Sequence, residues 1–78
     1  MLLYLYDIHA SDAKQFNRVK RRFYYSFKRS WLATCVMKSK SVIYVDDIYE
    51  LEADTFFMKF EGEIDVFKAR CSSVEQIM

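Results

Sequence analysis

The sequence contains no proline and only one glycine in 78 residues. These two residue types most often interrupt helices and strands, so we expect few hard breaks and few long loops. Histidine occurs once, and the two cysteines, Cys35 and Cys71, lack the CxxC spacing of a zinc or redox motif. We interpret them as free thiols rather than as a disulfide or metal site, which favours a reducing, cytoplasmic setting.

Long hydrophobic runs are also missing. The longest, Met1 to Tyr6, is much shorter than the roughly 20 apolar residues of a membrane-spanning helix. It has no preceding basic segment of the kind found in signal peptides, so we interpret it as a strand and expect no membrane partner. Apolar surface is nevertheless abundant, with 53% hydrophobic and 18% aromatic residues. On a chain long enough for one domain, this indicates that a second copy covers part of the surface.

Charge is distributed unevenly, although the net charge is only +1. No acidic residue lies between positions 13 and 45, where most of the cations are found, whereas most of the acids lie between positions 46 and 65. Such asymmetry indicates contact with nucleic acid. The alternatives are that the two halves neutralise each other within the fold, or that the basic face of one copy binds the acidic face of another.

Residues 2–8 predict a buried central strand, because they are apolar and rich in Leu and Tyr. In the loop that follows, Ser11 or Asp12 can cap a helix, and Asp12 and Gln15 have the spacing of a capping box. The helix itself is expected from Ala13 to about Ser30. Its apolar side is predicted to carry Phe16, Val19, Phe23 and Phe27.

The opposite side of this helix is strongly basic. Its expected nucleic-acid-binding residues are Lys14, Arg18, Arg21, Arg22, Lys28 and Arg29. A solvated helix face usually mixes Glu with Lys at i,i+4 spacing, but here like charges repel one another. We infer an external anion, and a phosphate backbone fits because several cations follow the helix axis. Tyr24 and Tyr25 are expected either to stack on bases or to pack at a dimer interface.

Two further strands are predicted at Trp31 to Met37 and at Ser41 to Val45, joined by Lys38-Ser39-Lys40 as a hairpin. A short second helix is expected next. Its cap is predicted at Asp46 or Asp47, with Asp47 and Glu50 at capping-box spacing, and its apolar stripe at Ile48, Leu51, Thr55 and Met58.

Glu61-Gly62 predicts a turn, with Gly62 as the residue just beyond the helix cap. A last strand is expected over Glu63 to Cys71, which makes residues 1–71 one domain and residues 72–78 a tail. The order strand, helix, strand, strand, helix, strand predicts an α+β fold of the ferredoxin-like type. In that plan, two helices cover one face of a four-stranded antiparallel sheet, and the other face needs a partner.

The sequence also resembles a known family. Tyr6-Asp7-Ile8 after an apolar first strand, the basic helix FNRVKRRFYYSFKR and the last strand EIDVFKARC are similar to the small CRISPR-associated adaptation subunit, CRISPR-associated protein 2. The resemblance covers residues 1 to about 71. Where that family has a Gln-x-Ser-Val-Phe-like stretch, this chain has Thr34-Cys35-Val36-Met37 or, in another register, Ser41-Val42-Ile43.

This resemblance implies a homodimer that binds duplex DNA or RNA and assembles with the CRISPR integrase subunit. It also implies that Asp7 from each protomer meets at the dimer interface and can hold Mg²⁺, with metal-dependent endonuclease activity in some members. From the residues alone, Asp7 is equally well explained as a capping carboxylate. His9 lies two residues further on and is a weaker candidate for a general base.

Two other functions remain open. The first is a small protein–protein adaptor, of a cellular or viral kind, whose basic helix docks on an acidic protein. The second is a toxin-like ribonuclease that uses Asp7 and His9, because virulence-associated D-type toxins share this start and plan. A Gly-rich phosphate loop and a His/Cys metal cluster are both absent from the sequence.

Overall fold

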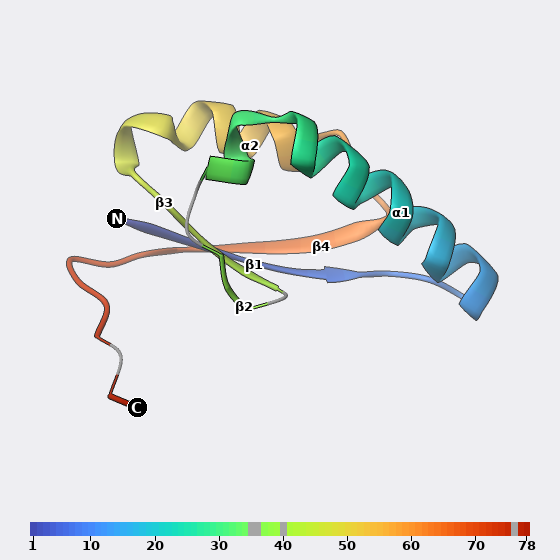
Figure 1. The fold of residues 1–78 in the computed structure, drawn as a ribbon, viewed down its shortest axis with the longest axis horizontal. Coiled ribbons are helices and arrows are strands. Elements are labelled where there is room, and N and C mark those ends of the chain that lie inside the picture. Colours follow the sequence, from blue (N-terminus) through green and yellow to red (C-terminus); the bar gives the residue numbers. More distant parts are fainter. Residues whose placement is uncertain (35–36, 40, 76) are drawn as a thin grey trace.

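The fold is an antiparallel sheet with two helices packed on one of its faces (Figure 1). The computed structural model describes residues 1–34, 37–39, 41–75 and 77–78. The elements in chain order are β1 (Leu2–Ile8), α1 (Ala13–Arg29), the 3₁₀ turn η1 (Trp31–Thr34), β2 (Met37–Ser39), β3 (Val42–Val45), the 3₁₀ turn η2 (Asp47–Tyr49), α2 (Glu50–Met58) and β4 (Ile64–Arg70). The expected α+β class is therefore confirmed.

Three strands form the body of the sheet. β1 lies in the middle, pairing with β3 from Leu2↔Val45 to Leu5↔Val42 and with β4 from Leu2↔Arg70 to Ile8↔Ile64. β2 adds only three residues beside β3, and its register shifts between Met37 and Ser39. A full four-stranded ferredoxin-like layout is therefore not reached.

The expected strand over residues 31–37 is wrong in its first half. Trp31–Thr34 forms a 3₁₀ turn instead. Leu32 is fully buried there, and Trp31 packs against Tyr49 with ring centroids 5.0 Å apart. A short apolar run is compatible with either a strand or a turn of helix, and packing of Leu32 into the core selects the turn. Cys35 and Val36 lie outside the described residues.

The core lies between the helices and one face of the sheet. Phe23 of α1 is at its centre, with ring centroids 4.9 Å from Tyr6 and 5.3 Å from Phe60. Tyr4 stacks on Phe57 of α2 at 5.2 Å. These large rings give a short chain enough buried apolar area for a stable core.

The predicted apolar stripe of α2 is wrong. Its exposed residues are Ile48 (77%), Leu51 (76%) and Met58 (69%). The buried side of the helix carries Ala53, Phe56 and Phe57, continued by Phe60 in the following turn. Asp46, one of the two predicted caps, is the N-cap of η2, but its side chain makes no cap hydrogen bond. The predicted capping box is wrong, because Asp47 lies inside η2 and pairs with the N-terminal ammonium, and α2 begins after Tyr49 without a side-chain cap bond.

The predicted turn at Glu61-Gly62 is confirmed. Gly62 has a φ of +84°, a left-handed conformation that side chains with a Cβ rarely adopt. It lies in the turn into β4 rather than directly after the cap of α2, which is Lys59. This turn brings β4 back alongside β1, and so sets Asp65 opposite Asp7.

Side chains alternate across the sheet, so its other face carries Leu3, Leu5, Val42, Tyr44 and Phe67. No helix in the described part of the chain covers that face (Figure 1). Phe67 is 70% exposed and Leu5 is 40% exposed, whereas the other three residues are partly buried. The open sheet face, as we call these five residues, is therefore an apolar surface with Leu5 and Phe67 exposed to solvent.

Candidate nucleic-acid interface

Helix α1 is built so that its two sides differ completely. Val19, Phe23 and Phe27 are buried against the sheet and α2. Phe16, expected on the same apolar side, is 38% exposed near the start of the helix. Every charged side chain of α1 is cationic and exposed to solvent.

The start of α1 is fixed by the predicted capping interactions. Asp12 Oδ1 accepts a hydrogen bond from the Gln15 backbone N–H at 2.8 Å. Gln15 Oε1 in turn accepts from the backbone N–H of Ser11 at 3.0 Å and from its hydroxyl at 2.7 Å. The helix therefore begins firmly at Ala13, and the first cation follows one residue later.

Three of the predicted cations lie together. Lys14, Arg18 and Arg21 line one hollow on the surface of α1, of about 280 Å³. Their spacing of four and three residues places them along one side of the helix. Among the described residues none of the three forms an ion pair with an acid, so we call them the basic row.

Lys28 belongs to a neighbouring, larger groove. The groove has a volume of about 640 Å³, and its described lining residues are Asn17, Lys20, Arg21, Tyr24, Tyr25 and Lys28. All of them come from α1. Arg21 is shared with the basic row, so the two surfaces adjoin.

Arg22 and Arg29, the last two predicted cations, already have partners within the protein. Arg22 forms an ion pair with Glu63, and its guanidinium lies 5.4 Å from the centre of the Phe60 ring. Arg29 donates a hydrogen bond to the Tyr25 hydroxyl at 3.0 Å. Arg22 is thus neutralised, whereas Arg29 keeps its charge because tyrosine is a neutral partner.

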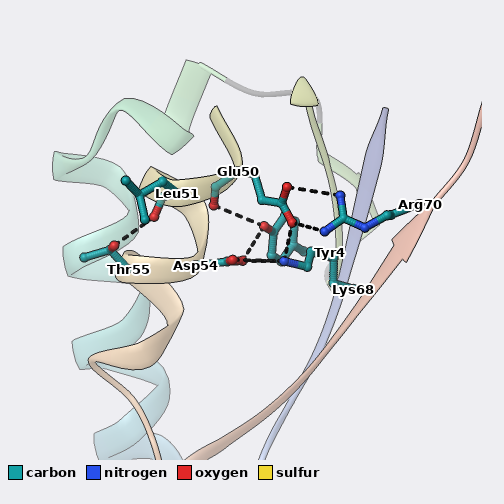
Figure 2. Close-up of polar contacts among 7 residues, drawn as sticks. All are labelled: Tyr4, Glu50, Leu51, Asp54, Thr55, Lys68 and Arg70. Carbon is teal, nitrogen blue, oxygen red and sulfur yellow. Dashed lines mark hydrogen bonds and ion pairs between the residues drawn. The ribbon is translucent and has the colours of Figure 1, made fainter. Parts of the chain in front are cut away.

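Part of the charge of the second half of the chain is balanced by one local ion-pair cluster. Figure 2 shows Glu50 and Asp54 of α2 facing Lys68 and Arg70 of β4, with Lys68 Nζ 2.9 Å from Asp54 Oδ2. The Tyr4 hydroxyl donates to Asp54 Oδ1 at 2.6 Å. Burial and this hydrogen bond raise the pKa of Tyr4 above its ordinary value.

The ion-pair cluster makes stability depend on pH. Hydrogen bonds from Arg70 and then Lys68 lower the pKa of Glu50 from 4.5 to about 2. A carboxyl with a depressed folded-state pKa stabilises the fold above pH 4.5, and this contribution is lost as the pH falls toward 2. We expect the urea midpoint to fall over that range, and to fall less in Glu50→Gln. An equal fall in both proteins would contradict this assignment.

Asp7 lies at the end of β1 on the open side of the sheet and is exposed. Its cross-strand neighbour is Asp65 of β4, whose carboxylate also contacts His9 Nε2. The structure thus brings both predicted residues, Asp7 and His9, to one acid that was not predicted. The sequence carried a signal for Asp65. Side chains alternate along a strand, and the last strand was expected in the same sheet as the first, where residues on one face meet across strands.

Mg²⁺ would find two carboxylates here, Asp7 and Asp65. Carboxylate oxygens are ligands of the right kind for this ion. Over residues 1–34, 37–39, 41–75 and 77–78, however, no group of three or more His, Cys, Asp or Glu side chains is placed to hold a metal ion. The described residues thus offer Mg²⁺ two carboxylates, and water or a phosphate would fill the rest of its coordination.

Comparison with known proteins adds no information on function, so the proposals below are based on the surfaces described above. No protein-family model, no curated protein and no solved structure matches the chain. In the part of the chain that the structure describes, no helix combines the length and apolar character needed to cross a membrane.

Proposed function

We propose that this protein binds nucleic acid by holding the phosphate backbone along α1. The observation that carries the proposal is the charge balance. The carboxylates of the ion-pair cluster between α2 and β4 pair with Lys68 and Arg70, and Asp47 pairs with the N-terminal ammonium, whose nitrogen lies 2.6 Å away. Among the described residues, the Arg22–Glu63 pair alone joins an α1 cation to an acid. The two halves therefore leave the positive charge of α1 largely unbalanced.

The length of α1 suits a phosphate backbone. From Lys14 to Lys28 the helix rises about 21 Å at 1.5 Å per residue. Phosphates follow one another at about 3.4 Å along each strand of a duplex. The cations of α1 therefore span several phosphates, in a contact that positions a duplex of DNA or RNA without reading its sequence.

The open sheet face supports the proposal of a homodimer. It presents apolar side chains, Leu5 and Phe67 among them, to solvent in the single chain. A second copy, related by a two-fold axis, would pack its own open sheet face on this one and cover the apolar side chains of both copies. The dimer would carry two α1 helices and twice as many phosphate contacts.

At the level of a family, we propose the small CRISPR-associated adaptation subunit, with the CRISPR integrase subunit as partner and a role in antiviral defence in the cytoplasm. The sheet order β2-β3-β1-β4 supports this proposal, because the ferredoxin-like plan has the same order, although β2 has only three residues here. Asp7 is the next-to-last residue of β1, and the basic helix α1 is the next element in the chain, in line with the resemblance.

A metal-dependent endonuclease is the second candidate function. It is supported by the cross-strand pair Asp7 and Asp65, which a dimer across the open sheet face would bring near its own copy. These four carboxylates would hold Mg²⁺, whose chemistry is to polarise a phosphate and activate water. If the protein cleaves nucleic acid, we expect Asp7→Asn to abolish cleavage that depends on Mg²⁺. Unchanged cleavage in this variant would exclude Asp7 from the site.

Duplex binding at increasing salt tests the leading proposal. Release of counterions makes the logarithm of affinity fall linearly with the logarithm of salt concentration, with a slope of about −0.9 per phosphate contact. We expect a steep negative slope for a short blunt duplex, measured by fluorescence anisotropy. A flat profile from low to moderate salt would rule out phosphate tracking by α1.

A further inference from the structure

We propose that the groove on α1 binds an unpaired nucleotide of a single-stranded DNA or RNA segment, with its base stacked on Tyr25. This inference rests in part on the proposed function, because the groove and the basic row share Arg21. It adds a second mode of binding, which a blunt duplex cannot use.

Tyr25 is an exposed aromatic residue whose position is fixed. The residue as a whole is 63% exposed. Arg29, one helical turn further on, donates a hydrogen bond to the Tyr25 hydroxyl at 3.0 Å, and its guanidinium lies 5.3 Å from the ring centre. A held ring loses little conformational freedom on binding, which favours its use as a stacking platform.

The groove beside Tyr25 is cationic. Lys20, Arg21 and Lys28 line it, and no acidic side chain is among its described lining residues. The phosphates that flank a stacked base would meet these three cations. Asn17 adds an amide that can both donate to and accept from the edge of a base.

Tyr24 links the groove to the end of β1. A smaller cleft of about 160 Å³ is lined by Asp7 and shares Lys20 and Tyr24 with the groove. Tyr24 is held by its edge-on packing against Phe23, with ring centroids 5.2 Å apart. A single strand seated on Tyr25 can therefore continue past Lys20 toward Asp7.

The occupant is an unpaired segment because of what stacking requires. In a duplex the faces of the bases are covered by their neighbours, and only the backbone and the groove edges are accessible. An unpaired base exposes its face, and aromatic side chains stack on it with little dependence on sequence. An exposed tyrosine inside a basic groove thus matches single-stranded nucleic acid better than a duplex.

The experiment compares a fluorescein-labelled 12-nucleotide oligo(dT), the matching oligo(U) and a blunt 12-base-pair duplex by anisotropy. We expect Tyr25→Ala to weaken binding of the single strands roughly 10-fold, and to change duplex binding by less than about twofold. Tyr25→Phe keeps the ring but loses the hydrogen bond from Arg29, so its affinity for the single strands should lie between that of the unchanged protein and that of Tyr25→Ala. Tyr49→Ala, which removes a tyrosine outside the groove, serves as the matched control.

The outcomes separate this inference from the proposed function. Duplex binding with no binding of either single strand would overturn the inference alone, as would an equal loss for strands and duplex in Tyr25→Ala. Failure of both ligands to bind would overturn the proposed function as well. Binding of the single strands that depends on Tyr25, without duplex binding, would support the inference and contradict the duplex proposal.

Discussion

A variant with Lys14, Arg18 and Arg21 all replaced by glutamine is expected to bind a short blunt duplex roughly 10- to 100-fold more weakly at moderate salt. These residues line one hollow and form no ion pair with an acid in the described part of the chain. Each lost phosphate contact should also reduce the salt slope by about one unit. Fluorescence anisotropy at several salt concentrations measures both effects.

Arg22→Gln is the matched control for this variant, since Arg22 lies on the same helix but is paired with Glu63. Because its charge is already balanced, its removal should change duplex affinity much less than removal of any one member of the basic row. Equal losses for Arg22→Gln and for Arg18→Gln would show that α1 acts only through its total charge. Unchanged affinity in the triple variant would place the binding surface elsewhere.

The second large effect is expected at the open sheet face. The double variant Leu5→Asp, Phe67→Asp should convert a homodimer into a monomer. Complete burial of a side chain of this size contributes about 1.5–3 kcal/mol, and the dimer would bury both residues of each copy. Introduced carboxylates would also face one another across the interface. Together these effects should raise the Kd for dimerisation at least roughly 100-fold.

Sizing by light scattering over a range of protein concentrations measures this shift, and circular dichroism checks the fold. The matched control is Ile48→Asp, Leu51→Asp, because both residues are large, apolar and even more exposed than Leu5 and Phe67 but belong to η2 and α2. It should remain dimeric. If the unmodified protein is monomeric at every concentration, the dimer proposal is wrong. If the control variant dissociates, the interface lies at η2 and α2 instead.

The elements best predicted from the sequence are those in which one pattern of residues dominates. In α1, the apolar spacing, the cap at Asp12 and the cationic face all agree, so its bounds and its buried side were predictable apart from Phe16. The strand β1 was likewise marked by an apolar run, and the start of β4 by the turn at Glu61-Gly62 before it. Such elements can be predicted from the sequence because their local signals agree.

In α2, two apolar stripes compete. Ile48, Leu51 and Met58 have helical spacing, but so do Ala53, Phe56, Phe57 and Phe60. The second set has three phenylalanines, whose larger area outweighs that of the first set when the helix turns toward the core. The greater aromatic content was the available signal, and it was missed.

The candidate site was predictable only in part for a similar reason. Cations along one helix can be found from their spacing alone, so the basic row was identified. Cancellation of charge depends on residues distant in sequence, as in Arg22 with Glu63, 41 positions apart. The encounter of Asp7 with Asp65 depends on the register of β1 and β4, which one strand by itself does not specify.

The position of β4 at the end of the sheet order has a consequence for aggregation. An edge strand of seven residues offers backbone N–H and C=O groups to any extended chain that approaches, and uninterrupted apolar edges recruit such chains into fibrils. β4 carries Asp65, Lys68 and Arg70, and the two cations are held in place by Glu50 and Asp54. An incoming strand would have to desolvate these charges. The ion-pair cluster that joins α2 to the sheet therefore also disfavours the addition of a further strand beside β4.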